Sequence, residues 1–442
     1  MGKRAQKHDF MAVVLILVTF ALTLAGLVAV YSTTAMTAAT EDRIIPDALR
    51  NQFFFAIVGF AVGYVIYRAI PVRIWAGKIT WALWALAVLL LIVTAVYGTE
   101  VLGAKRWLEI GSFRFQPSEF MKVAFVIMAA KIVEEHRTGA ITRLGMWVSL
   151  GARVGLPIVA MLLAQSDLGT TMVCLVGVIA VLWLGGVPGR DVAIFCAGCI
   201  ALGTLAIVTS PYRLQRFLTT FDPWADGQGG LGSGYQLIHS LYALSSGGAW
   251  GVGIGGSFEK YGSLPEAETD FIFAVVGEEC GLFGTIVIIA LFIGFLWAGL
   301  RISNQAVTTF GATFAGALSV TLVFQAFLNI ASVIGVWPMT GKPLPFMSYG
   351  GSSLIMSLVM VGMIASVTRE ESPSEREARR RRDELIVVRP IRGRDKQGGN
   401  AVVEHLDRHG RGSDSRLSGA SRNSDFASRD KGGGRNGQRR RR

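Results

Sequence analysis

Charged side chains are scarce in this sequence. They make up 17% of its 442 residues, whereas a soluble domain usually contains about a quarter. Hydrophobic residues account for 51%. Several apolar runs approach the ~20 residues needed to cross the hydrocarbon core of a bilayer. This shortage of charge excludes an ordinary soluble protein and predicts an all-α polytopic membrane protein.

Cysteine and histidine are also few, with four and five residues respectively. Cys196 and Cys199 have C-x-x-C spacing, but neither a second cysteine pair nor a histidine cluster accompanies them. A structural zinc site or a dithiol redox site needs such partners. Because all four cysteines lie in apolar runs, we assign them to helix packing.

The apolar runs predict about ten membrane-spanning helices. They lie at 10–32, 51–69, 77–98, 118–134, 147–165, 168–187, 191–210, 270–300, 306–332 and 351–368. Lysine and arginine concentrate in alternate short loops, which predicts that both termini are cytoplasmic. The other loops then face outward. The loop 211–269, between the seventh and eighth helices, is too long for a simple connection.

The two ends of the chain differ from this membrane domain. We assign 1–9 to a cytoplasmic N-terminus, 10–368 to the ten-helix domain and 369–442 to a basic cytoplasmic tail. The tail has 21 Lys/Arg and 12 Asp/Glu residues and few apolar ones, so we expect it to be disordered. Its position favours contact with anionic lipid. The near absence of aromatic residues argues against specific nucleic-acid binding.

Acidic residues cluster where the loop 211–269 meets the eighth helix. Asp270 marks the mouth of this helix, and Glu278 and Glu279 follow about two turns later, ~12 Å further along the axis. An ionised group at that depth costs several kcal/mol unless it faces a partner or a wet cavity. The sequence therefore predicts a partner or a cavity for both glutamates.

Charges of both signs gather in the outward loops. The basic residues are Lys105, Arg106, Lys122, Arg213, Arg216, Lys260 and Lys342, and the acidic residues are Glu119, Asp167, Glu266 and Asp270. Arginine and lysine suit phosphate recognition, and a carboxylate can act as a general base for a hydroxyl. Together with long apolar helices, these groups suit a phosphorylated lipid substrate, although a transporter also places charges in a cavity. Glu119 and Lys122 are three residues apart and are expected to pair on one helix face.

Four motifs stand in order along the chain. They are KRWLEIGSFRFQPSEFMK at 105–122, QSDLGT at 165–170, LPEAETDFIFAVVGEE at 264–279 and GKPLPFMSYGGSS at 341–353, with the shorter piece GSGYQ at 232–236. Together they resemble the SEDS family of shape, elongation, division and sporulation proteins, over residues 10–368. The resemblance implies a peptidoglycan glycosyltransferase of the bacterial cytoplasmic membrane. Such proteins polymerise lipid II, the undecaprenyl-pyrophosphate disaccharide-pentapeptide, outside that membrane.

The resemblance also implies roles for individual residues. Asp270 matches the proposed catalytic aspartate of the family's TDF triplet. Glu119 and Lys122 match the charged pair of the QPSE-x-x-K segment, and Arg106 matches the basic residue before the tryptophan. The substrate-binding residues that we expect are Arg106, Lys105, Glu119, Lys122, Asp167, Arg213, Arg216, Tyr235, Gln236, Glu266, Ser348 and Ser352.

The sequence departs from the family's pattern at three positions. Glu268 stands where many members have histidine, and His239 stands where glutamine is common. Lys342 stands two positions after the lysine of many members. Lys342 is therefore a weaker candidate for a phosphate ligand than Arg106 or Lys122.

The resemblance implies partners as well, namely a class B penicillin-binding protein and the other proteins of the divisome or elongasome. The SYGGSS stretch and the long tail are more similar to FtsW-type (division) than to RodA-type (elongation) members. No cofactor is certain, and a divalent cation, Mg²⁺ or Mn²⁺, stays open. A lipid II flippase and a non-catalytic scaffold for the penicillin-binding protein are the alternative functions.

Overall fold

A computed structural model of the chain describes residues 3–40, 42–101, 104–111, 113–370 and 377. The chain divides into two units, Met1–Arg379 and Arg380–Arg442, and the second lies outside the described residues. The tail predicted at 369–442 is therefore described only at 369–370 and 377. Its disorder and its contact with anionic lipid stay predictions.

The described chain is mainly helical, with a small sheet at one end of the bundle. In order, the elements are α1 Lys3–Thr40, α2 Asp47–Ala69, α3 Val72–Ala76, α4 Lys78–Tyr97, β1 Thr99–Val101, β2 Ala104–Ile110, β3 Phe113–Phe115, α5 Pro117–Arg137, α6 Arg143–Leu150, a π-helical turn Gly151–Gly155, α7 Leu156–Gln165, α8 Leu168–Leu184, α9 Gly189–Val208, α10 Pro211–Phe221, α11 Tyr235–Gly247, α12 Ile272–Gln305, α13 Thr309–Val333, α14 Gly351–Ser366 and a 3₁₀ turn Val367–Arg369. The predicted all-α membrane class is confirmed, with three short strands that the sequence did not predict.

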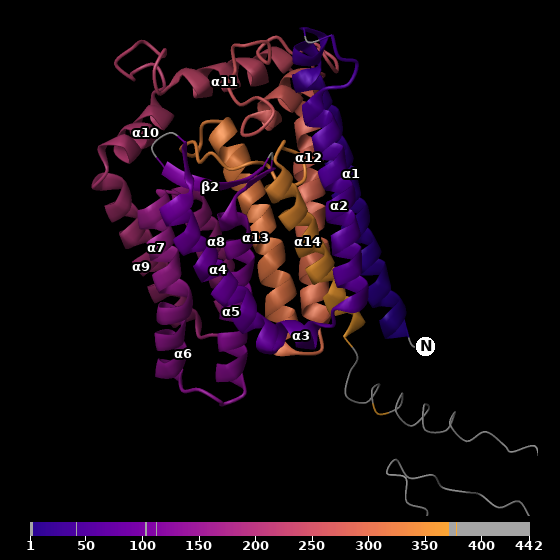
Figure 1. Cartoon of the computed structure of the whole chain (residues 1–442), viewed down its shortest axis with the longest axis vertical. Helices are drawn as coiled ribbons and strands as arrows, with labels where there is room; N and C mark the ends of the chain where they lie inside the picture. Colours follow the sequence, from indigo (N-terminus) through magenta and orange to yellow (C-terminus); the bar gives the residue numbers. More distant parts are fainter. Residues whose placement is uncertain (1–2, 41, 102–103, 112, 371–376, 378–442) are drawn as a thin grey trace, which may run out of the picture. The chain divides into compact units, whose positions relative to one another are not determined.

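Eight spans in the described residues are long and apolar enough to cross a membrane. One of them runs through α6, the π-helical turn and α7, over Arg143–Gln165. The other two predicted spans coincide with α5, which has 21 residues, and the shorter α8, which has 17. The count of ten spans stays a prediction. The N-terminal end of α1 and the C-terminal end of α14 lie at the same end of the bundle, opposite α10 and α11 (Figure 1), as the predicted orientation requires. Following that orientation, we call the end with α10 and α11 the outer end.

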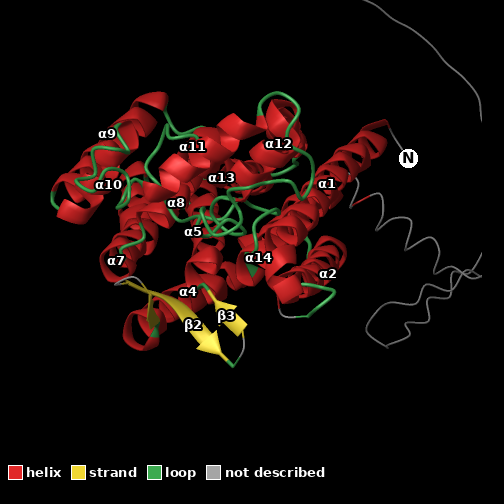
Figure 2. Cartoon of the chain, turned by 90° about the horizontal axis from the view of Figure 1, so that it is seen from above, coloured by secondary structure: helices red, strands yellow, loops and turns green. Residues whose placement is uncertain are grey.

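Helix α13 forms the centre of the bundle and contacts α5, α8, α12 and α14. Figure 2 shows it surrounded by these helices when the bundle is viewed along its length. Its side chains are buried on nearly every face. In contrast, α9 at the edge of the bundle has mostly exposed apolar side chains, as a helix facing lipid should. The core is therefore built from α5, α13 and α14.

Helices α2 and α14 pack almost backbone to backbone. A Cβ atom added at Gly362 would lie 2.3 Å from the carbonyl oxygen of Gly63, and one added at Gly63 would lie 2.8 Å from that of Leu358. Small residues allow such close approach of helices in a membrane. Gln52 of α2 also donates from Nε2 to the carbonyl of Ser348 at 2.9 Å, so α2 holds the loop before α14 in place.

The outward loops are structured rather than open. The loop 99–117 forms an antiparallel sheet in the order β1-β2-β3, and Glu109 faces Arg114 across β2 and β3. The loop 211–269 contains two helices, α10 and α11. The loop 333–350 is irregular, as its prolines require, and its second half, from Leu344 to Ser348, is buried. Residues of the loops 211–269 and 333–350 line the candidate site.

Candidate functional site

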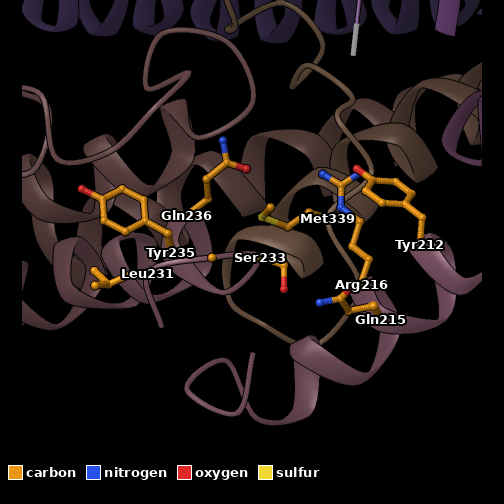
Figure 3. A pocket seen from close by; sticks show the side chains of 9 residues that line it. Tyr212, Gln215, Arg216, Leu231, Ser233, Tyr235, Gln236 and Met339 are labelled. Atoms are coloured by element: carbon orange, nitrogen blue, oxygen red, sulfur yellow. The ribbon is translucent and has the colours of Figure 1, made fainter. Parts of the chain in front are cut away.

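Two adjoining cavities lie at the outer end of the bundle. The large cavity has a volume of about 380 Å³ and is lined by Tyr212, Gln215, Arg216, Leu231, Gly232, Ser233, Tyr235, Gln236 and Met339. The small cavity, of about 20 Å³, is lined by Arg216, Gln236, Asp270, Phe271, Asn329, Ser332, Val333, Met339, Thr340, Gly341 and Lys342. Both cavities share Arg216, Gln236 and Met339. Figure 3 shows the large cavity, with Arg216 beside Tyr212 on one side and Tyr235 beside Leu231 on the other.

Asp270, the predicted catalytic residue, is half-buried in the small cavity just before α12. In the part of the chain that the structure describes, its carboxylate makes no hydrogen bond or ion pair. Burial, and then the Glu266 carboxylate, raise the pKa of Asp270 to about 6, against the opposing charges of Lys342, Arg216 and Arg106. A carboxylate with a pKa near neutrality and free oxygens can accept a proton from a hydroxyl.

Gly341 lets the loop 333–350 pass close to Asp270. Its φ is +61°, a backbone conformation that glycine adopts most easily. A Cβ atom added there would lie 3.5 Å from Oδ2 of Asp270. A larger residue at position 341 would therefore strain the loop and narrow the space beside the carboxylate.

Lys342 is paired with Asp167. Its Nζ atom lies 2.6 Å from Oδ2 of Asp167, and both side chains are buried. Asp167 also caps α8, because its carboxylate accepts hydrogen bonds from the backbone N–H and the hydroxyl of Thr170 at 3.0 and 2.8 Å. Burial acts to raise the pKa of Asp167, but Lys342, Arg106 and these hydrogen bonds hold it below its usual value. Lys342 lines the small cavity with its charge already balanced.

Arg106 and Lys105 lie on β2, outside the lining of both cavities. Arg106 donates from Nε to the carbonyl of Gln165 at 2.9 Å and from Nη2 to that of Ser166 at 3.0 Å. Ser166 has a left-handed φ of +49°, so Arg106 holds a tight turn directly before Asp167. Lys105 donates to the carbonyl of Val96 at 3.3 Å. A direct contact of either residue with phosphate stays a prediction.

Glu119 and Lys122 form the predicted pair. Nζ of Lys122 lies 2.7 Å from Oε2 of Glu119, and both side chains are almost completely buried. Lys122 also donates to Oε1 of Gln325 at 2.5 Å, and Nε2 of Gln325 donates to the carbonyl of Pro343 at 3.0 Å. The pair thus supports the loop beneath the small cavity without lining it.

Gln325 and Asn329 were not predicted as site residues. They lie one turn apart on α13, and Nδ2 of Asn329 donates to the carbonyls of Asp270 and Lys342 at 2.7 and 2.8 Å. Asn329 therefore fixes the backbone on both sides of the small cavity. Two amides four residues apart within an apolar helix are a usable signal, because buried polar groups in a membrane helix usually mark function.

Ser348 and Ser352 are buried and hold backbone atoms. The Ser348 hydroxyl donates to the carbonyl of Thr269 at 2.5 Å and accepts the N–H of Leu344 at 2.8 Å. Ser352 accepts the N–H of Gln116 at 3.4 Å. Neither serine lines either cavity. Ser348 joins the loop 333–350 to the segment before Asp270, and substrate contact at the two serines stays a prediction.

The remaining predicted residues divide into two groups. Arg216, Tyr235 and Gln236 line the large cavity. Arg213 donates to the carbonyl of Ala206 at 3.1 Å, at the end of α9, and Glu266 is exposed and accepts the Thr269 hydroxyl at 2.8 Å. Arg213 and Glu266 line neither cavity, and Glu266 acts on Asp270 through its charge.

The two glutamates within α12 have the partners that their depth requires. Glu278 accepts the Ser257 hydroxyl at 2.5 Å and the N–H of Phe258 at 2.9 Å. Glu279 lies 2.7 Å from Nζ of Lys260, and both side chains are buried. Lys260, predicted as one of the basic outer residues, therefore holds the segment between α11 and α12 against α12 and lines neither cavity.

Over the residues that the structure describes, no group of three or more His, Cys, Asp or Glu side chains could hold a metal ion. Asp270 is the carboxylate in the lining of the small cavity. A single carboxylate fits an ion only if substrate oxygens complete its shell, as Mg²⁺ sites with phosphate substrates do. The residues present fit a cation that arrives with a phosphorylated substrate.

The comparisons with known proteins agree with this arrangement. The profile of the Cell cycle protein family, which covers FtsW, RodA and SpoVE, matches residues 12–373. Stage V sporulation protein E of Bacillus subtilis is 35% identical over 365 residues, which are 80% of this chain and 96% of that protein. A probable peptidoglycan glycosyltransferase FtsW of Hydrogenovibrio crunogenus is 35% identical over 325 residues, covering 73% of this chain and 82% of the relative.

Solved structures match over the same region. One comes from work on the structural coordination of polymerization and crosslinking by a peptidoglycan synthase complex. It aligns with a TM-score of 0.65 at 28% identity, over 80% of this chain and 96% of that chain. The crystal structure of the rod shape determining protein RodA of Thermus thermophilus aligns with a TM-score of 0.58 at 26% identity, over 80% of this chain and 95% of that chain.

The matched region, residues 12–373, contains most of α1, all of the other helices and both cavities. It also contains the four motifs on which the resemblance rests. The chain therefore belongs to the FtsW/RodA/SpoVE family, as a multi-pass protein of the bacterial cytoplasmic membrane.

Proposed function

We propose that the protein is a peptidoglycan glycosyltransferase that polymerises lipid II into β-1,4-linked strands at the outer face of the cytoplasmic membrane. The observation that carries the proposal is the small cavity, where the free carboxylate of Asp270 shares a lining with the guanidinium of Arg216. The carboxylate of Asp270 can accept the proton of an attacking hydroxyl. The guanidinium of Arg216 can bind a leaving group that carries phosphate. Relatives named peptidoglycan glycosyltransferase support the same activity.

The reaction assigns one role to each group. The 4-hydroxyl of the GlcNAc of one substrate attacks C1 of the MurNAc of the other, and its proton passes to Asp270. The bond from C1 to the phosphate oxygen breaks, and the lipid pyrophosphate leaves with the electron pair, so C1 inverts to the β configuration. Within the described residues, the guanidinium of Arg216 makes no hydrogen bond or ion pair and lies 5.9 Å from the centroid of the Tyr212 ring, so its charge is available to stabilise the pyrophosphate. Asp167 balances the charge of Lys342, which leaves Arg216 as the main cationic side chain for this step.

A divalent cation is part of the proposal. One oxygen of Asp270, the pyrophosphate oxygens and water would supply the oxygen ligands that Mg²⁺ or Mn²⁺ takes, which leaves the second oxygen of Asp270 to accept the proton. A bound cation would add to the neutralisation of the leaving group. Purified protein stripped with EDTA should lose polymerisation and regain it when Mg²⁺ or Mn²⁺ is added back. Full activity in EDTA would limit charge neutralisation to side chains.

The partner that we propose is a class B penicillin-binding protein, which would cross-link the strands. The match to a chain from a peptidoglycan synthase complex supports this partner. The relatives named FtsW support a role in cell division rather than elongation. Other divisome proteins would then join the assembly.

Purified full-length protein in detergent or vesicles, supplied with labelled lipid II, tests the function. Glycan polymer is the expected product. Movement of lipid II between leaflets without polymer would indicate a flippase instead. A protein that binds the penicillin-binding protein but gives neither polymer nor movement of lipid II would be a scaffold.

A further inference from the structure

We propose that the large cavity binds the sugar of the acceptor substrate, an N-acetylated hexosamine, and presents its 4-hydroxyl to Asp270. The inference rests on the proposed function and specifies which of the two substrates this cavity holds. The donor, whose reacting carbon carries the pyrophosphate, would then meet the acceptor at the junction of the two cavities.

The lining of the large cavity suits a neutral sugar. Gln215, Gln236 and Ser233 can each donate and accept hydrogen bonds, as the hydroxyl and acetamido groups of a hexosamine require. Tyr212 and Tyr235 also line the cavity, and a tyrosine ring combines an apolar face with a polar tip, which suits a pyranose ring. The Arg216 guanidinium lies 5.9 Å from the centroid of the Tyr212 ring, and the His239 ring lies 4.3 Å from that of Tyr235. Among the described residues, the side chains of Gln215, Gln236 and Tyr235 have no hydrogen-bond partner. Their hydrogen-bonding capacity is free for a ligand.

One wall of the cavity is built before any ligand arrives. The carboxylate of Asp226 accepts the backbone N–H groups of Gln228, Gly230, Gly232 and Gly234 at 2.9, 2.9, 2.8 and 3.2 Å. These hydrogen bonds, of which that of Gly230 has the largest effect, lower the pKa of Asp226 to about 2, so its carboxylate stays ionised. The loop that presents Ser233 is therefore fixed, which lowers the entropic cost of binding. The volume of about 380 Å³ lies within the range of roughly 300–1,000 Å³ for small-molecule sites.

Charge decides between acceptor and donor. In the lining of the large cavity, Arg216 carries the charge, and it lies where this cavity meets that of Asp270. A donor sugar bears its pyrophosphate on the reacting carbon, so its charge belongs at that junction. An acceptor lipid has its pyrophosphate at the far end of a disaccharide, away from the reacting hydroxyl. The uncharged part of the cavity beyond Arg216 therefore suits the acceptor sugar.

Two lipid II analogues separate the substrates in a test. A 4-deoxy analogue at GlcNAc lacks the nucleophile and serves only as donor. An analogue with a methylene group in place of the anomeric oxygen cannot release pyrophosphate and serves only as acceptor. The full-length protein with its penicillin-binding partner couples them once, and KM and kcat are measured for each analogue.

We expect Tyr235→Ala and Gln215→Ala to raise the KM of the acceptor about 10-fold or more, which is the effect of one lost contact of about 1.4 kcal/mol. The KM of the donor should change less than about 3-fold, a difference that corresponds to well under 1 kcal/mol. Tyr235→Phe keeps the ring and removes only the hydroxyl, so it should raise the KM of the acceptor less than Tyr235→Ala does. Tyr242→Ala is the matched control, because Tyr242 lies on the same helix and lines neither cavity. Its two KM values should equal those of the wild type.

Three results would overturn the inference. A rise in the KM of the donor alone would place the donor sugar in the large cavity. Unchanged KM values for both analogues would remove the cavity from substrate binding. If the wild-type protein coupled no lipid II of any kind, the proposed function would fail and this inference with it, whereas the first two results leave the proposed function intact.

Discussion

Nζ of Lys342 lies 2.6 Å from Oδ2 of Asp167, although the two residues are 175 positions apart in the sequence. The ion pair ties the loop before α14 to the start of α8. It also cancels the lysine's charge at the small cavity. We therefore expect Lys342 to position the loop in the folded protein rather than to serve as a phosphate ligand.

Removing one member of this pair should destabilise the protein strongly. Lys342→Met leaves the Asp167 carboxylate buried without its cation, which typically costs about 3–5 kcal/mol. The double variant Asp167→Asn with Lys342→Met should recover most of the melting temperature measured in detergent. Arg114→Ala breaks an exposed ion pair with Glu109 and should leave the melting temperature unchanged. A double variant as unstable as the sum of its single variants would contradict the pairing.

Asp270→Asn should abolish most of the activity. The substitution keeps the shape of the side chain and removes the basic oxygen, and a general base is typically worth ~10²–10⁴ in rate. Polymerisation of labelled lipid II should fall at least that far, while membrane insertion and partner binding remain. Glu268→Gln, two residues earlier, is the control and should lose much less. Activity within a few-fold of the wild type in Asp270→Asn would move the base to another carboxylate.

The pKa of Asp270, about 6 against a usual 3.8, predicts a pH dependence with two opposite signs. Activity should rise with pH through about 6, because only the ionised carboxylate can accept a proton. Stability should fall over the same range. The folded protein binds this proton more tightly than the unfolded chain does, so the stabilisation present below about pH 4 is lost as pH rises through 6.

Thermal unfolding of Asp270→Asn measures the second effect. The variant should melt above the wild type near neutral pH and close to it near pH 4, where the wild-type carboxyl is also uncharged. A variant that melts below the wild type near neutral pH would show that the ionised carboxylate stabilises the fold.

The buried ion pair of Glu119 and Lys122 on α5 contacts Gln325 on α13, and we expect the two parts of this network to have different effects. Glu119→Ala or Lys122→Ala leaves one charge unpaired in the core and should reduce both folding yield and polymerisation, at a cost of about 3–5 kcal/mol. Gln325→Leu removes the link from Lys122 to the carbonyl of Pro343 while the ion pair remains. It should lower activity more than stability. Equal losses in both measurements would mean that Gln325 acts only in packing.

Deletion of 374–442 should leave polymerisation in detergent nearly unchanged. The sequence composition of this segment predicts disorder, and its net basic charge predicts contact with anionic lipid. Binding of the deleted protein to vesicles that contain anionic lipid should weaken compared with the full chain. Near-complete loss of polymerisation in a folded, truncated protein would show that the tail takes part in the reaction.

The helices could be predicted from the sequence because the bilayer restricts what can span it. Apolar runs such as 306–332 and 351–368 became α13 and α14 with only small shifts at their ends. Depth was also predictable, since charge inside hydrocarbon needs a partner. The structure confirms this expectation, because Glu278 and Glu279 both have buried partners.

The identity of most partners could not be predicted. Hydropathy gives the depth of a residue but neither the rotation of its helix nor the neighbour that it faces. The contact of Lys342 with Asp167, and the reach of Asn329 to the carbonyls of Asp270 and Lys342, depend on how α8, α12 and α13 pack. The strands β1–β3 were missed because they are short and lie in a loop whose charges obscure any alternation of apolar residues.

The joint formed by Ser32, Lys260 and Glu279 bears on the order in which the protein is assembled. Nζ of Lys260 donates to the Ser32 hydroxyl at 2.8 Å and to Glu279 at 2.7 Å, so it needs both α1 and α12 in place. Ribosomes make the long outer loop before they make α12. The loop must therefore wait outside the membrane until the helix that follows it has been inserted. A nascent chain arrested before Glu278 should therefore leave this loop open to protease. A chain extended far enough to insert α12 should have the loop protected.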